Sequence, residues 1–488
     1  MNIAIAASEC APFAKTGGLS DVVGSLPKAL AKLGCTVKVF LPKYSVINDA
    51  QYPMRLDLAV GEMQVRVGGF PRTVHVLKSK LPDSDVDVYF IDCPHYFHRA
   101  RIYTSDWDED ERFILFQKSV IEALQRLQWK PDVIHCNDWQ TGLMPLLLRD
   151  NYGWDRLFEK TATVLSIHNI AYQGWFSRDA GIRAELRKEH LDKGGLAEWG
   201  GGVNFLKTGL ATADLLTTVS ETYAREILTP DYGNGMDVVL NWRNGDLFGI
   251  LNGIDDNIWN PQSDKFIPFH FSIDNLDGKE KNKRFLLDQT TINYNPNIPL
   301  IGIVSRMVSQ KGFDLIEKEV HWLMQKNAQW VILGSGEDRF ENLFTWMAHE
   351  FSHKVWTYIG FNTELSHLVE AGADMFLMPS HYEPCGLNQM YSLRYGTVPI
   401  VHKTGGLADT VQDWDEYAYN GQFIGNGFSF TEPSGFALSH AVHRAIEAYH
   451  NKPLWRRIQQ NGMTRDFSWT NSARKYIDLY KRAKAKRG

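Results

Sequence analysis

The chain has 488 residues, of which 44% are hydrophobic and 22% charged, with a formal net charge of -5. This is ordinary globular composition at a length of two or three domains, which excludes disordered, collagen-like and coiled-coil architectures. The small net charge gives no indication of nucleic-acid binding. Aromatic residues make up 12% of the chain, and their flat rings serve cores but also stack on bases and sugars.

The number and spacing of the cysteines and the length of the apolar N-terminal segment indicate the cellular compartment of the protein. The chain has five widely spaced cysteines and no CxxC pair: Cys10, Cys35, Cys93, Cys136 and Cys385. This pattern argues against a disulfide framework and a cysteine-rich zinc site, and favours a reduced, cytoplasmic protein. The apolar start at 2–7 is too short for a signal peptide, and no apolar run approaches the ~20 residues of a membrane helix. We therefore expect no membrane partner.

The first half of the chain alternates strand and helix patterns. Residues 2–7 read as a buried strand, and a helix over about 20–33 ends near Gly34 before a strand at 36–41. This βαβ unit predicts a parallel sheet covered on both faces by helices. A β-hairpin insertion is expected at 61–78, and further strands are expected at 86–91, 132–136, 163–167 and 215–219.

The alternation begins again near residue 298, after a stretch rich in Asn, Asp and Pro at 252–297. Strands are expected there at 299–304, 329–333, 355–359, 374–378 and 398–401. The sequence thus predicts an α/β protein with two doubly wound, Rossmann-like domains that face each other across a deep cleft. We place the N-terminal domain at 1–250, the C-terminal domain at 251–466 and a final helix at 467–488. Such sheets bind ligands at the carboxyl ends of their strands.

The motif Lys-Thr-Gly-Gly-Leu occurs twice, at 15–19 and 403–407, and seven of the nine positions of 15–23 and 403–411 are identical. Each copy follows an expected strand and opens an expected helix, where backbone amides and the helix dipole favour an anion. Adjacent glycines allow a phosphate to approach closely, and the lysine adds a full charge. Two such turns could hold a diphosphate from two sides, although each could also be only a tight strand-to-helix turn.

Two cations and a carboxylate follow strands of the second half. Arg306 and Lys311 share one loop and suit a diphosphate leaving group, whose negative charge grows as its bond to a sugar breaks. Taken alone, Arg and Lys in a loop are usually solvated surface. Glu383 could hydrogen-bond sugar hydroxyls, stabilise a cationic transition state, or only cap a helix.

Together these motifs resemble the bacterial glycogen synthases and plant starch synthases, glycosyltransferase family 5. The resemblance runs in order from Met1 to about Tyr480 and rests on both KTGGL copies, HNIAYQG at 168–174, NGID at 252–255, Arg306 with Lys311, and EPCGL at 383–387. It implies the GT-B fold and transfer of glucose from ADP-glucose to the non-reducing end of an α-1,4-glucan, glycogen or a maltooligosaccharide, with retention of configuration. ADP is then the product, and no metal or other cofactor is expected.

The resemblance also implies roles for individual residues. The expected catalytic residues are Lys15, Asp138, His168, Arg306, Lys311 and Glu383. The expected donor-binding residues are Lys15, Gly17, Gly18, Arg306, Lys311, Phe361, Leu387, Thr404, Gly405, Gly406 and Leu407. The expected acceptor- or sugar-binding residues are Glu9, Asp21, Phe97, Asp138, Trp139 and Asn252. Phe361 stands where the family carries an aromatic residue, often Tyr, against the adenine; it keeps the ring face and lacks the hydroxyl.

The C-terminal segment fits the same family. Trp469, Tyr476 and Tyr480 share one helical face, and in the family the last helix crosses back onto the N-terminal domain. The basic run from Lys481 to Arg487 is interpreted as a solvated tail.

Three other patterns point to different chemistry. HExxH at 349–353 is a zinc-binding pattern, but it has no third ligand nearby. Gly334-Ser335-Gly336 lacks the third glycine of a dinucleotide fingerprint. Asp-x-Asp at 106–108 and 413–415 would suit a metal-dependent GT-A transferase, which the two-domain layout argues against.

Two alternative functions stay open at this point. One is a GT-B transferase that uses UDP-glucose, such as a sucrose- or trehalose-forming enzyme. The other is a non-catalytic glucan-binding scaffold, against which stands the presence of Lys15, Arg306, Lys311 and Glu383. The sequence gives no oligomeric state.

Overall fold

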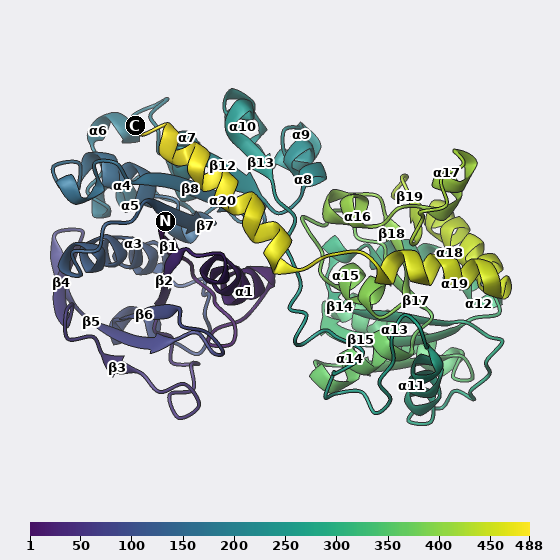
Figure 1. The fold of residues 1–488 in the computed structure, drawn as a ribbon. Helices are drawn as coiled ribbons and strands as arrows, with labels where there is room; N and C mark the ends of the chain where they lie inside the picture. The colour runs from purple at the N-terminus through teal and green to yellow at the C-terminus, as the bar shows by residue number, and fades with distance from the viewer. The chain divides into compact units, whose positions relative to one another are not determined.

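The computed structural model describes all residues, 1–488. The chain forms two compact units, one of Met1–Gly253 together with Trp469–Gly488 and one of Ile254–Ser468 (Figure 1). We call them the first and the second unit. The domain boundaries expected from the sequence lie after residues 250 and 466.

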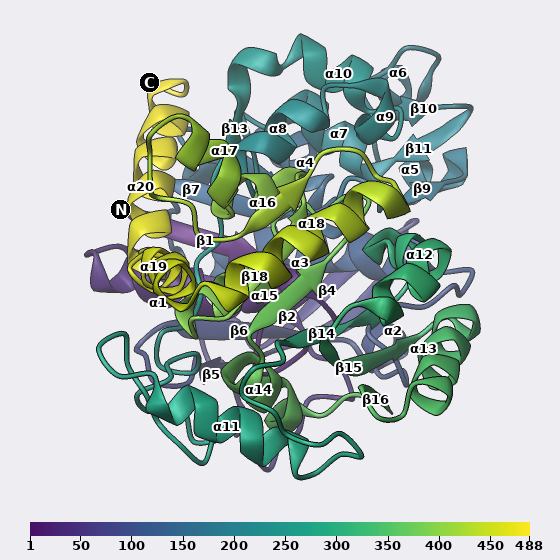
Figure 2. The ribbon, with the colours of Figure 1, turned by 90° about the vertical axis from the view of Figure 1, so that its right-hand side faces the viewer.

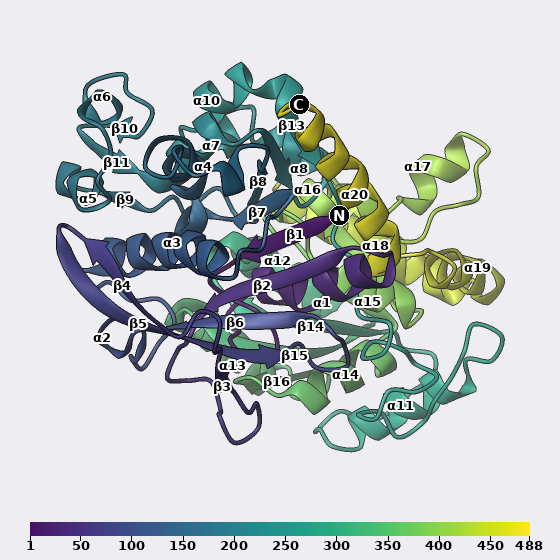
Figure 3. The ribbon, with the colours of Figure 1, turned by 60° about the vertical axis from the view of Figure 1, so that its left-hand side comes forward.

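The first unit is built on a ten-stranded sheet with the order β13-β12-β8-β7-β1-β2-β6-β5-β3, in which β4 pairs with β5. Figure 3 shows β7, β1, β2, β6 and β5 following one another across it. The strands are β1 (Asn2–Ala6), β2 (Thr36–Pro42), β3 (Arg55–Leu56), β4 (Glu62–Val67), β5 (Phe70–Lys80), β6 (Asp87–Asp92), β7 (Val133–Asn137), β8 (Ala162–Ile167), β12 (Leu215–Thr218) and β13 (Leu247–Gly249).

The expectation of a parallel sheet is confirmed from β13 to β6. The expected hairpin insertion is also confirmed: β4 and β5 pair antiparallel, and β5 adds to the edge beyond β6, antiparallel to it. A separate small antiparallel sheet was not predicted; its strands are β9 (Trp175–Phe176), β10 (Glu198–Trp199) and β11 (Gly202–Asn204).

Helix α1 connects β1 to β2, and α3 lies in the connection from β6 to β7. The helices are α1 (Gly18–Lys32), α2 (Pro94–Phe97), α3 (Glu109–Arg126), α4 (Met144–Asp150), α5 (Arg178–Arg183), α6 (Lys188–Leu191), α7 (Phe205–Thr212), α8 (Glu221–Glu226), α9 (Pro230–Gly233), α10 (Asp237–Trp242) and α20 (Trp469–Ala485). Helix α1 ends beside Gly34, whose φ of 87° is a backbone conformation that glycine adopts without strain.

The C-terminal helix α20 returns to the first unit, along α1 and strands β7 and β8 (Figure 1). The basic run after Tyr480 is not a solvated tail, and that interpretation is wrong. Three of its side chains form ion pairs with aspartates of the first unit: Lys484 with Asp132, Lys486 with Asp246 and Arg487 with Asp214. Asp132 also accepts the backbone amide of Asn2 at 2.7 Å, so this carboxylate links the two ends of the chain.

A buried hydrogen bond also attaches α20 to the sheet. The Tyr480 hydroxyl lies 2.8 Å from Nδ1 of His135, whose Nε2 lies 2.6 Å from the Ser166 hydroxyl. We predict that Tyr480→Phe lowers the free energy of unfolding by about 1–2 kcal/mol, since it leaves a buried ring nitrogen without its partner. Urea unfolding followed by circular dichroism measures this. The control is Tyr419→Phe at an exposed tyrosine, and equal stability of the two variants would contradict the prediction.

The second unit is built on a six-stranded sheet with the order β16-β15-β14-β17-β18-β19. All neighbouring strands are parallel, as predicted. The strands are β14 (Leu300–Met307), β15 (Gln329–Gly336), β16 (Val355–Ile359), β17 (Met375–Met378), β18 (Val398–His402) and β19 (Phe428–Phe430). Figure 2 shows helix α18 in front of this sheet. The helices are α11 (Asp277–Leu287), α12 (Phe313–Gln325), α13 (Asp338–Glu350), α14 (Thr363–Gly372), α15 (Asn388–Arg394), α16 (Gly405–Thr410), α17 (Trp414–Tyr419), α18 (Gly435–His450) and α19 (Lys452–Met463).

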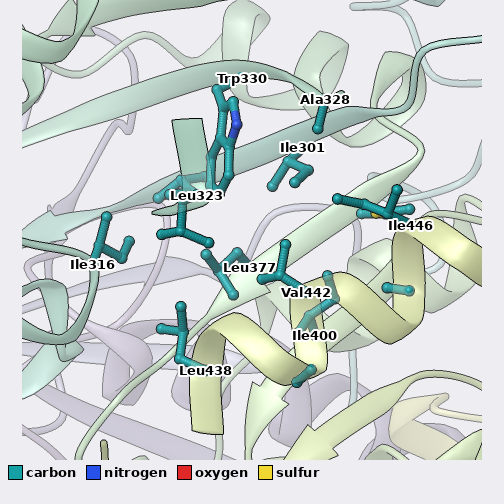
Figure 4. Packing of buried hydrophobic residues seen from close by; sticks show 14 of the residues in the cluster. Ile301, Ile316, Leu323, Ala328, Trp330, Leu377, Ile400, Leu438, Val442 and Ile446 are labelled. Carbon is teal, nitrogen blue, oxygen red and sulfur yellow. The ribbon is translucent and has the colours of Figure 1, made fainter. Parts of the chain in front are cut away.

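Helix α18 covers this sheet with one apolar face. Leu438, Val442 and Ile446 recur every fourth residue, so they lie on one side of the helix, and they pack on Leu377 and Ile400 of the sheet (Figure 4). Burial of each such side chain contributes roughly 1.5–3 kcal/mol. This packing fixes β17 and β18, and with them the loops that follow these strands.

The order of strands reverses once in each sheet, and such a point is where open α/β sheets bind ligands. In the second unit, β15 and β16 lie on one side of β14, whereas β17, β18 and β19 lie on the other. In the first unit, the reversal lies between β1 and β7. The loops after β1, β7, β14 and β17 are therefore the candidate sites.

The competing motifs have structural explanations. Helix α13 ends at Glu350, so His353 of the HExxH pattern lies beyond the helix, and both histidines are exposed. The Asp-x-Asp pairs each bind an arginine: Asp106 and Asp108 pair with Arg99, and Asp413 and Asp415 pair with Arg444. No group of three or more His, Cys, Asp or Glu side chains is arranged to hold a metal. None of the helices is both long and apolar enough to cross a bilayer.

Candidate functional site

A pocket of about 360 Å³ lies at the strand-order reversal of the second unit. Its walls come from the ends of β14, β15 and β17 and from the loops that follow them. The structure brings together here five of the residues that the sequence singled out: Arg306, Lys311, Phe361, Glu383 and Leu387.

An ion pair joins two loops at this pocket. Lys311 Nζ lies 2.6 Å from Oε2 of Glu383, and the Ser380 hydroxyl donates to the same oxygen at 3.0 Å. Gly312 makes this approach possible, since its φ is 72° and an added Cβ would lie 2.0 Å from the carbonyl oxygen of Pro379. The Glu383 side chain is thereby held in place; only 6% of this residue is exposed.

Cationic charge and an open ring face characterise the rest of the pocket. Arg306 is exposed at the end of β14 and adds a second cation to that of Lys311. The ring of Phe361, which follows β16, is 83% exposed, and a large ring in water beside a pocket is suited to stacking on a flat ligand. The pocket therefore offers two positive charges, one carboxylate and one stacking surface.

The lining also includes polar residues that were not assigned to this site from the sequence, among them Ser305, Ser335 and Asn388. Gly334 and Ser335 belong to the glycine pattern that was set aside as a poor dinucleotide fingerprint. Gly334 is required by packing, because an added Cβ would lie 1.9 Å from the Ser305 carbonyl oxygen. Asn388 follows EPCGL directly and donates to the carbonyl oxygen of Val304 at 2.7 Å, which ties α15 to β14.

The second KTGGL copy packs behind this pocket. An added Cβ on Gly405 would lie 1.9 Å from the Glu383 carbonyl oxygen, and one on Gly406 would lie 2.0 Å from that of Cys385. The Gly406 amide donates to the Glu383 carbonyl at 3.1 Å. These glycines thus let α16 support the backbone of the EPCGL loop, a role that the sequence did not indicate.

Two donor-binding residues expected in this copy have buried side chains. Leu407 is packed against Val401 and Val411 in a small core cluster, and Thr404 is buried at the N-terminus of α16. The Leu407 side chain faces this cluster, and the expected donor binding by Leu407 stays a prediction.

The first KTGGL copy follows β1 in the first unit and differs from the second. The carboxylate of Glu9 accepts hydrogen bonds from the Thr16 amide at 2.6 Å, the Thr16 hydroxyl at 2.6 Å and the Gly17 amide at 3.1 Å. An added Cβ on Gly17 or Gly18 would meet nothing within 4 Å. Packing therefore does not require these two glycines, and the space beside them is open at the N-terminus of α1.

Glu9 was expected to contact a sugar, and the structure gives its carboxylate a different task. It is buried, and besides Thr16 and Gly17 it accepts the Tyr103 hydroxyl at 2.6 Å. Glu9 thus holds the KTGGL loop to Tyr103. Tyr103 has no local sequence signal for this role, because it lies 94 residues from Glu9.

Lys15 and Asp21 lie at the surface of this loop. Lys15 Nζ is 2.6 Å from Oδ1 of Asp21, and the Lys15 side chain is 55% exposed. Burial raises the pKa of Asp21, and the Lys15 charge partly opposes this. The ammonium group of Lys15 is thus held at the N-terminus of α1 while it stays accessible to an anion.

Asp138 and His168 meet at the carboxyl ends of β7 and β8. Oδ1 of Asp138 accepts the His168 amide at 2.7 Å, and His168 Nε2 donates to Oδ1 of Asn137 at 2.9 Å. Burial lowers the pKa of His168 to about 3, so its imidazole is neutral at physiological pH. Burial raises the pKa of Asp138 to about 7, although the amides of His168 and Asn169 oppose this. Asp138 has a φ of 55°, a strained conformation of the kind that gathers at functional sites.

Two aromatic residues expected at the acceptor site are buried. Phe97 is 0% exposed and packs edge-on against Tyr44. Trp139 is 9% exposed and packs against Phe113, and an added Cβ on Gly174 would lie 2.4 Å from its ring. Neither ring has an open face in this structure, and the expected sugar contacts of Phe97 and Trp139 stay predictions. Trp139 acts as the support on which the HNIAYQG loop lies.

Asn252 lies at the end of the first unit and is buried. Its Oδ1 accepts no hydrogen bond in the structure. A buried acceptor without a partner is uncommon in folded proteins, and the structure thus leaves the expected sugar contact of Asn252 as a prediction.

Comparisons with known proteins bear on this site. The model of the starch synthase catalytic domain matches residues 2–242, and the model of the glycosyl transferases group 1 matches residues 288–465. The glycogen synthase of Syntrophotalea carbinolica is 44% identical over 488 residues, which cover 99% of this chain and 99% of that protein. The chain belongs to the glycogen and starch synthase family of glycosyltransferases.

Other members of this family are similar to the chain over nearly its whole length. The glycogen synthase of Geobacillus thermodenitrificans is 43% identical, covering 98% of this chain and 97% of that one. A solved structure titled as the catalytic domain of starch synthase IV from Arabidopsis thaliana bound to ADP and acarbose is 33% identical, with a TM-score of 0.90 and 99% of each chain covered. The GT-B fold is thereby confirmed. A sucrose-phosphate synthase from Thermosynechococcus elongatus, with a TM-score of 0.60, 17% identity and 99% of each chain covered, shares the fold.

Proposed function

We propose that this protein transfers glucose from ADP-glucose to the non-reducing end of an α-1,4-glucan, with retention of configuration and without a metal. The observation that carries the proposal is the pocket of the second unit, which combines Arg306, Lys311, Glu383 and the exposed ring of Phe361. Family membership supports it, as does the similar starch synthase IV structure, whose title names ADP and acarbose.

The proposed chemistry breaks the bond between the anomeric carbon of glucose and the diphosphate and forms a bond to the acceptor hydroxyl oxygen, while the hydroxyl proton leaves and ADP is released. Arg306 and Lys311 stabilise the charge that grows on the diphosphate. Phe361 stacks on the adenine. Glu383 hydrogen-bonds the donor sugar.

The residues of the first unit have parts in the same proposal. Lys15, Gly17 and Gly18 act on the diphosphate at the N-terminus of α1. His168, which is neutral at physiological pH, serves the donor sugar by hydrogen bonding rather than as a charged acid. Asp138 holds the His168 amide and thereby positions this residue.

Two alternative functions, a UDP-glucose-dependent transferase and a non-catalytic scaffold, each differ from the proposed function in a property that can be measured. A transferase that uses UDP-glucose would keep the fold, and the 17% identical sucrose-phosphate synthase shows that this fold extends to such a distant chain. A scaffold would bind glucan without turnover. The 33–44% identity to starch and glycogen synthases over nearly the whole chain favours the glucan synthase reaction.

The deciding experiment is nucleotide release with glycogen as acceptor, with ADP-glucose and UDP-glucose compared in the presence of a chelator. We expect ADP release and elongated glucan, without a metal requirement. Preference for UDP-glucose would assign the enzyme to another donor class. Absence of release from either donor, in protein that binds ADP or glucan, would support the scaffold.

Removal of the exposed ring should weaken donor binding. We predict that Phe361→Ala raises KM for ADP-glucose by about 5- to 100-fold, since stacking of a base on an aromatic ring is worth roughly 1–3 kcal/mol. Initial rates at saturating glycogen measure this. Phe361→Tyr is the matched control and should keep KM within about threefold, because it preserves the ring face. Equal KM values for Phe361→Ala and Phe361→Tyr would show that Phe361 does not stack on the adenine.

The pKa of Asp138 predicts the acidic side of the pH–rate profile. As pH falls through about 7, the Asp138 carboxylate gains a proton and loses its charge as the acceptor of the His168 amide. We therefore expect kcat/KM to fall roughly tenfold per pH unit below this value, as for one ionisation. Asp138→Asn should be less active and should lack this fall. Persistence of the acidic limb in that variant would assign it to another group.

A further inference from the structure

Two tryptophans share one face of the small sheet formed by β9, β10 and β11. In the register of this sheet, Trp175 lies opposite Asn204, and Trp199 lies opposite Gly202. Opposite residues point to the same face of a sheet, and side chains alternate along a strand, so Trp175, Trp199 and Gly202 belong to one face. The other face carries Val203, which is 0% exposed. The tryptophans therefore lie on the outer face of the small sheet.

The Trp175 ring is held in place on this outer face. Its Nε1 donates to the carbonyl oxygen of Trp199 at 2.8 Å, which satisfies the one polar atom of the ring. An added Cβ on Gly202 would lie 2.9 Å from Cε2 and Cζ2 of the ring, so the ring lies directly against this glycine. Trp175 is nonetheless 56% exposed. We call Trp175 and the half-buried Trp199 the tryptophan platform.

The turn between β10 and β11 fixes the strand that carries Trp199. Gly200 and Gly201 form this turn with φ values of 59° and 82°, which glycine adopts without strain. The Glu198 carboxylate accepts the Gly201 amide at 3.0 Å and the Gly194 amide at 3.1 Å. The carbonyl group that binds the Trp175 ring is thus part of a closed hairpin, and the platform is formed before any ligand is bound.

The platform continues directly from the HNIAYQG loop. Gly174, the last residue of this loop, lies against the Trp139 ring, and its carbonyl oxygen accepts the Phe205 amide at 3.0 Å. Trp175 comes seven residues after His168, and seven residues span at most about 25 Å. The platform therefore belongs to the same region of the first unit as His168, which we place at the donor sugar.

The chemistry of the platform fits a glucan. The face of an aromatic ring is slightly negative and attracts the slightly positive C–H groups on the flat side of a sugar ring. Tyr172, which is 60% exposed, adds a further ring and a hydroxyl group three residues before Trp175. In transfer to a non-reducing end, only the terminal sugar of the acceptor reaches the donor glucose. The other sugars of the acceptor need a surface of their own.

We propose that the tryptophan platform is an acceptor subsite, at which a sugar ring of the α-1,4-glucan stacks on Trp175 away from the bond that is formed. The proposal rests on the function proposed above, because that function supplies the glucan acceptor. It gives the small sheet a role in holding the polymer, and it makes Trp175 a residue that determines the affinity for the acceptor and not for the nucleotide.

The first test measures glucan binding without a donor, so it does not depend on turnover. Maltoheptaose is titrated into the full-length protein by calorimetry, and circular dichroism checks that each variant is folded. We expect Trp175→Ala to raise Kd about tenfold, as for the loss of one aromatic contact. Trp175→Phe keeps a ring and should recover most of the affinity.

Trp154→Ala is the matched control for this test. Trp154 is 74% exposed, and its Nε1 also donates to a backbone carbonyl, that of Asn151 at 3.0 Å. We expect this variant to bind maltoheptaose like the wild type. Wild-type affinity in Trp175→Ala would overturn the proposal, and an equal loss of affinity in Trp154→Ala would do the same.

The second test assigns the ring to the acceptor side of the reaction. We expect Trp175→Ala to raise KM for glycogen about tenfold and to leave KM for ADP-glucose unchanged. A similar rise in KM for ADP-glucose would mean that the ring serves the donor, which contradicts the proposal. If the wild type shows no turnover but Trp175→Ala still loses glucan binding, the proposed function fails and the subsite stands.

Discussion

Lys311→Ala is expected to lower kcat/KM by about 10²- to 10³-fold, because it removes a fixed positive charge that the proposed reaction needs as the diphosphate leaves. The same change leaves Glu383 in a buried position with only the Ser380 hydroxyl as partner. Removal of one member of a buried ion pair costs about 3–5 kcal/mol. Since Lys311 is 17% exposed, we expect the lower end of this range.

A matched set of variants separates the two effects. Lys311→Met combined with Glu383→Gln removes both charges, so we expect it to recover much of the stability and none of the activity. Lys318→Ala removes an exposed lysine whose pair with Asp314 is solvated, and it should change stability by less than about 0.5 kcal/mol. Initial rates and urea unfolding of the four proteins give both quantities. Activity of Lys311→Ala within fivefold of the wild type would exclude Lys311 from transition-state stabilisation.

The fold could be predicted where the strands are long, buried and followed by helices. The strands β1, β2, β14 and β15 have five to eight residues and are largely apolar, and their alternation with helices predicted parallel sheets. The small sheet of β9, β10 and β11 has strands of only two or three residues, which carry no periodic pattern. The antiparallel edge at β5 could not be predicted either, because the hairpin pattern gives no information on which strand it joins.

The charged residues of the candidate site could be predicted from the sequence, whereas the residues that hold them in place could not. Arg306, Lys311 and Glu383 lie at or after the carboxyl ends of β14 and β17, where the strand order reverses. Ligands bind at such a point in open α/β sheets, so the strand order alone predicts that these residues lie together. Tyr103 and Ser380 hold Glu9 and Glu383, and such contacts depend on how distant loops pack. Trp139 stands beside Asp138 in the chain but faces the core, since neighbouring residues of a turn point in different directions.

The two KTGGL copies have the same five residues, but their glycines have different roles. Gly405 and Gly406 are required because the backbone of the Glu383–Cys385 segment lies against them, and Gly405 has a φ of 46°. Gly17 has an extended φ of -154°, and nothing lies within 4 Å of an added Cβ at Gly17 or Gly18. The same letters therefore serve packing in one copy and leave open space in the other. Only the surroundings, which lie far away in the sequence, distinguish them.

The first KTGGL copy, which has open space beside its glycines, also carries Lys15. We predict that Lys15→Ala lowers kcat by about 10²- to 10³-fold, if its charge acts on the diphosphate as the bond to glucose breaks. The Lys15 side chain is 55% exposed although Asp21 is partly buried, so the change should alter the free energy of unfolding by less than about 1 kcal/mol. Lys15 thus differs from Lys311, whose removal is expected to affect activity and stability together.

Lys32→Ala provides the control, because this exposed lysine lies in the last turn of the same helix. Asp21→Asn releases Lys15 from its partner without removing the charge, so we expect a loss of less than tenfold. Steady-state kinetics with ADP-glucose varied and glycogen saturating separate kcat from KM. A rise in KM with unchanged kcat would mean that Lys15 binds the donor equally in the ground state and the transition state. Unchanged kcat and KM would remove Lys15 from the mechanism and leave Arg306 and Lys311 to stabilise the diphosphate.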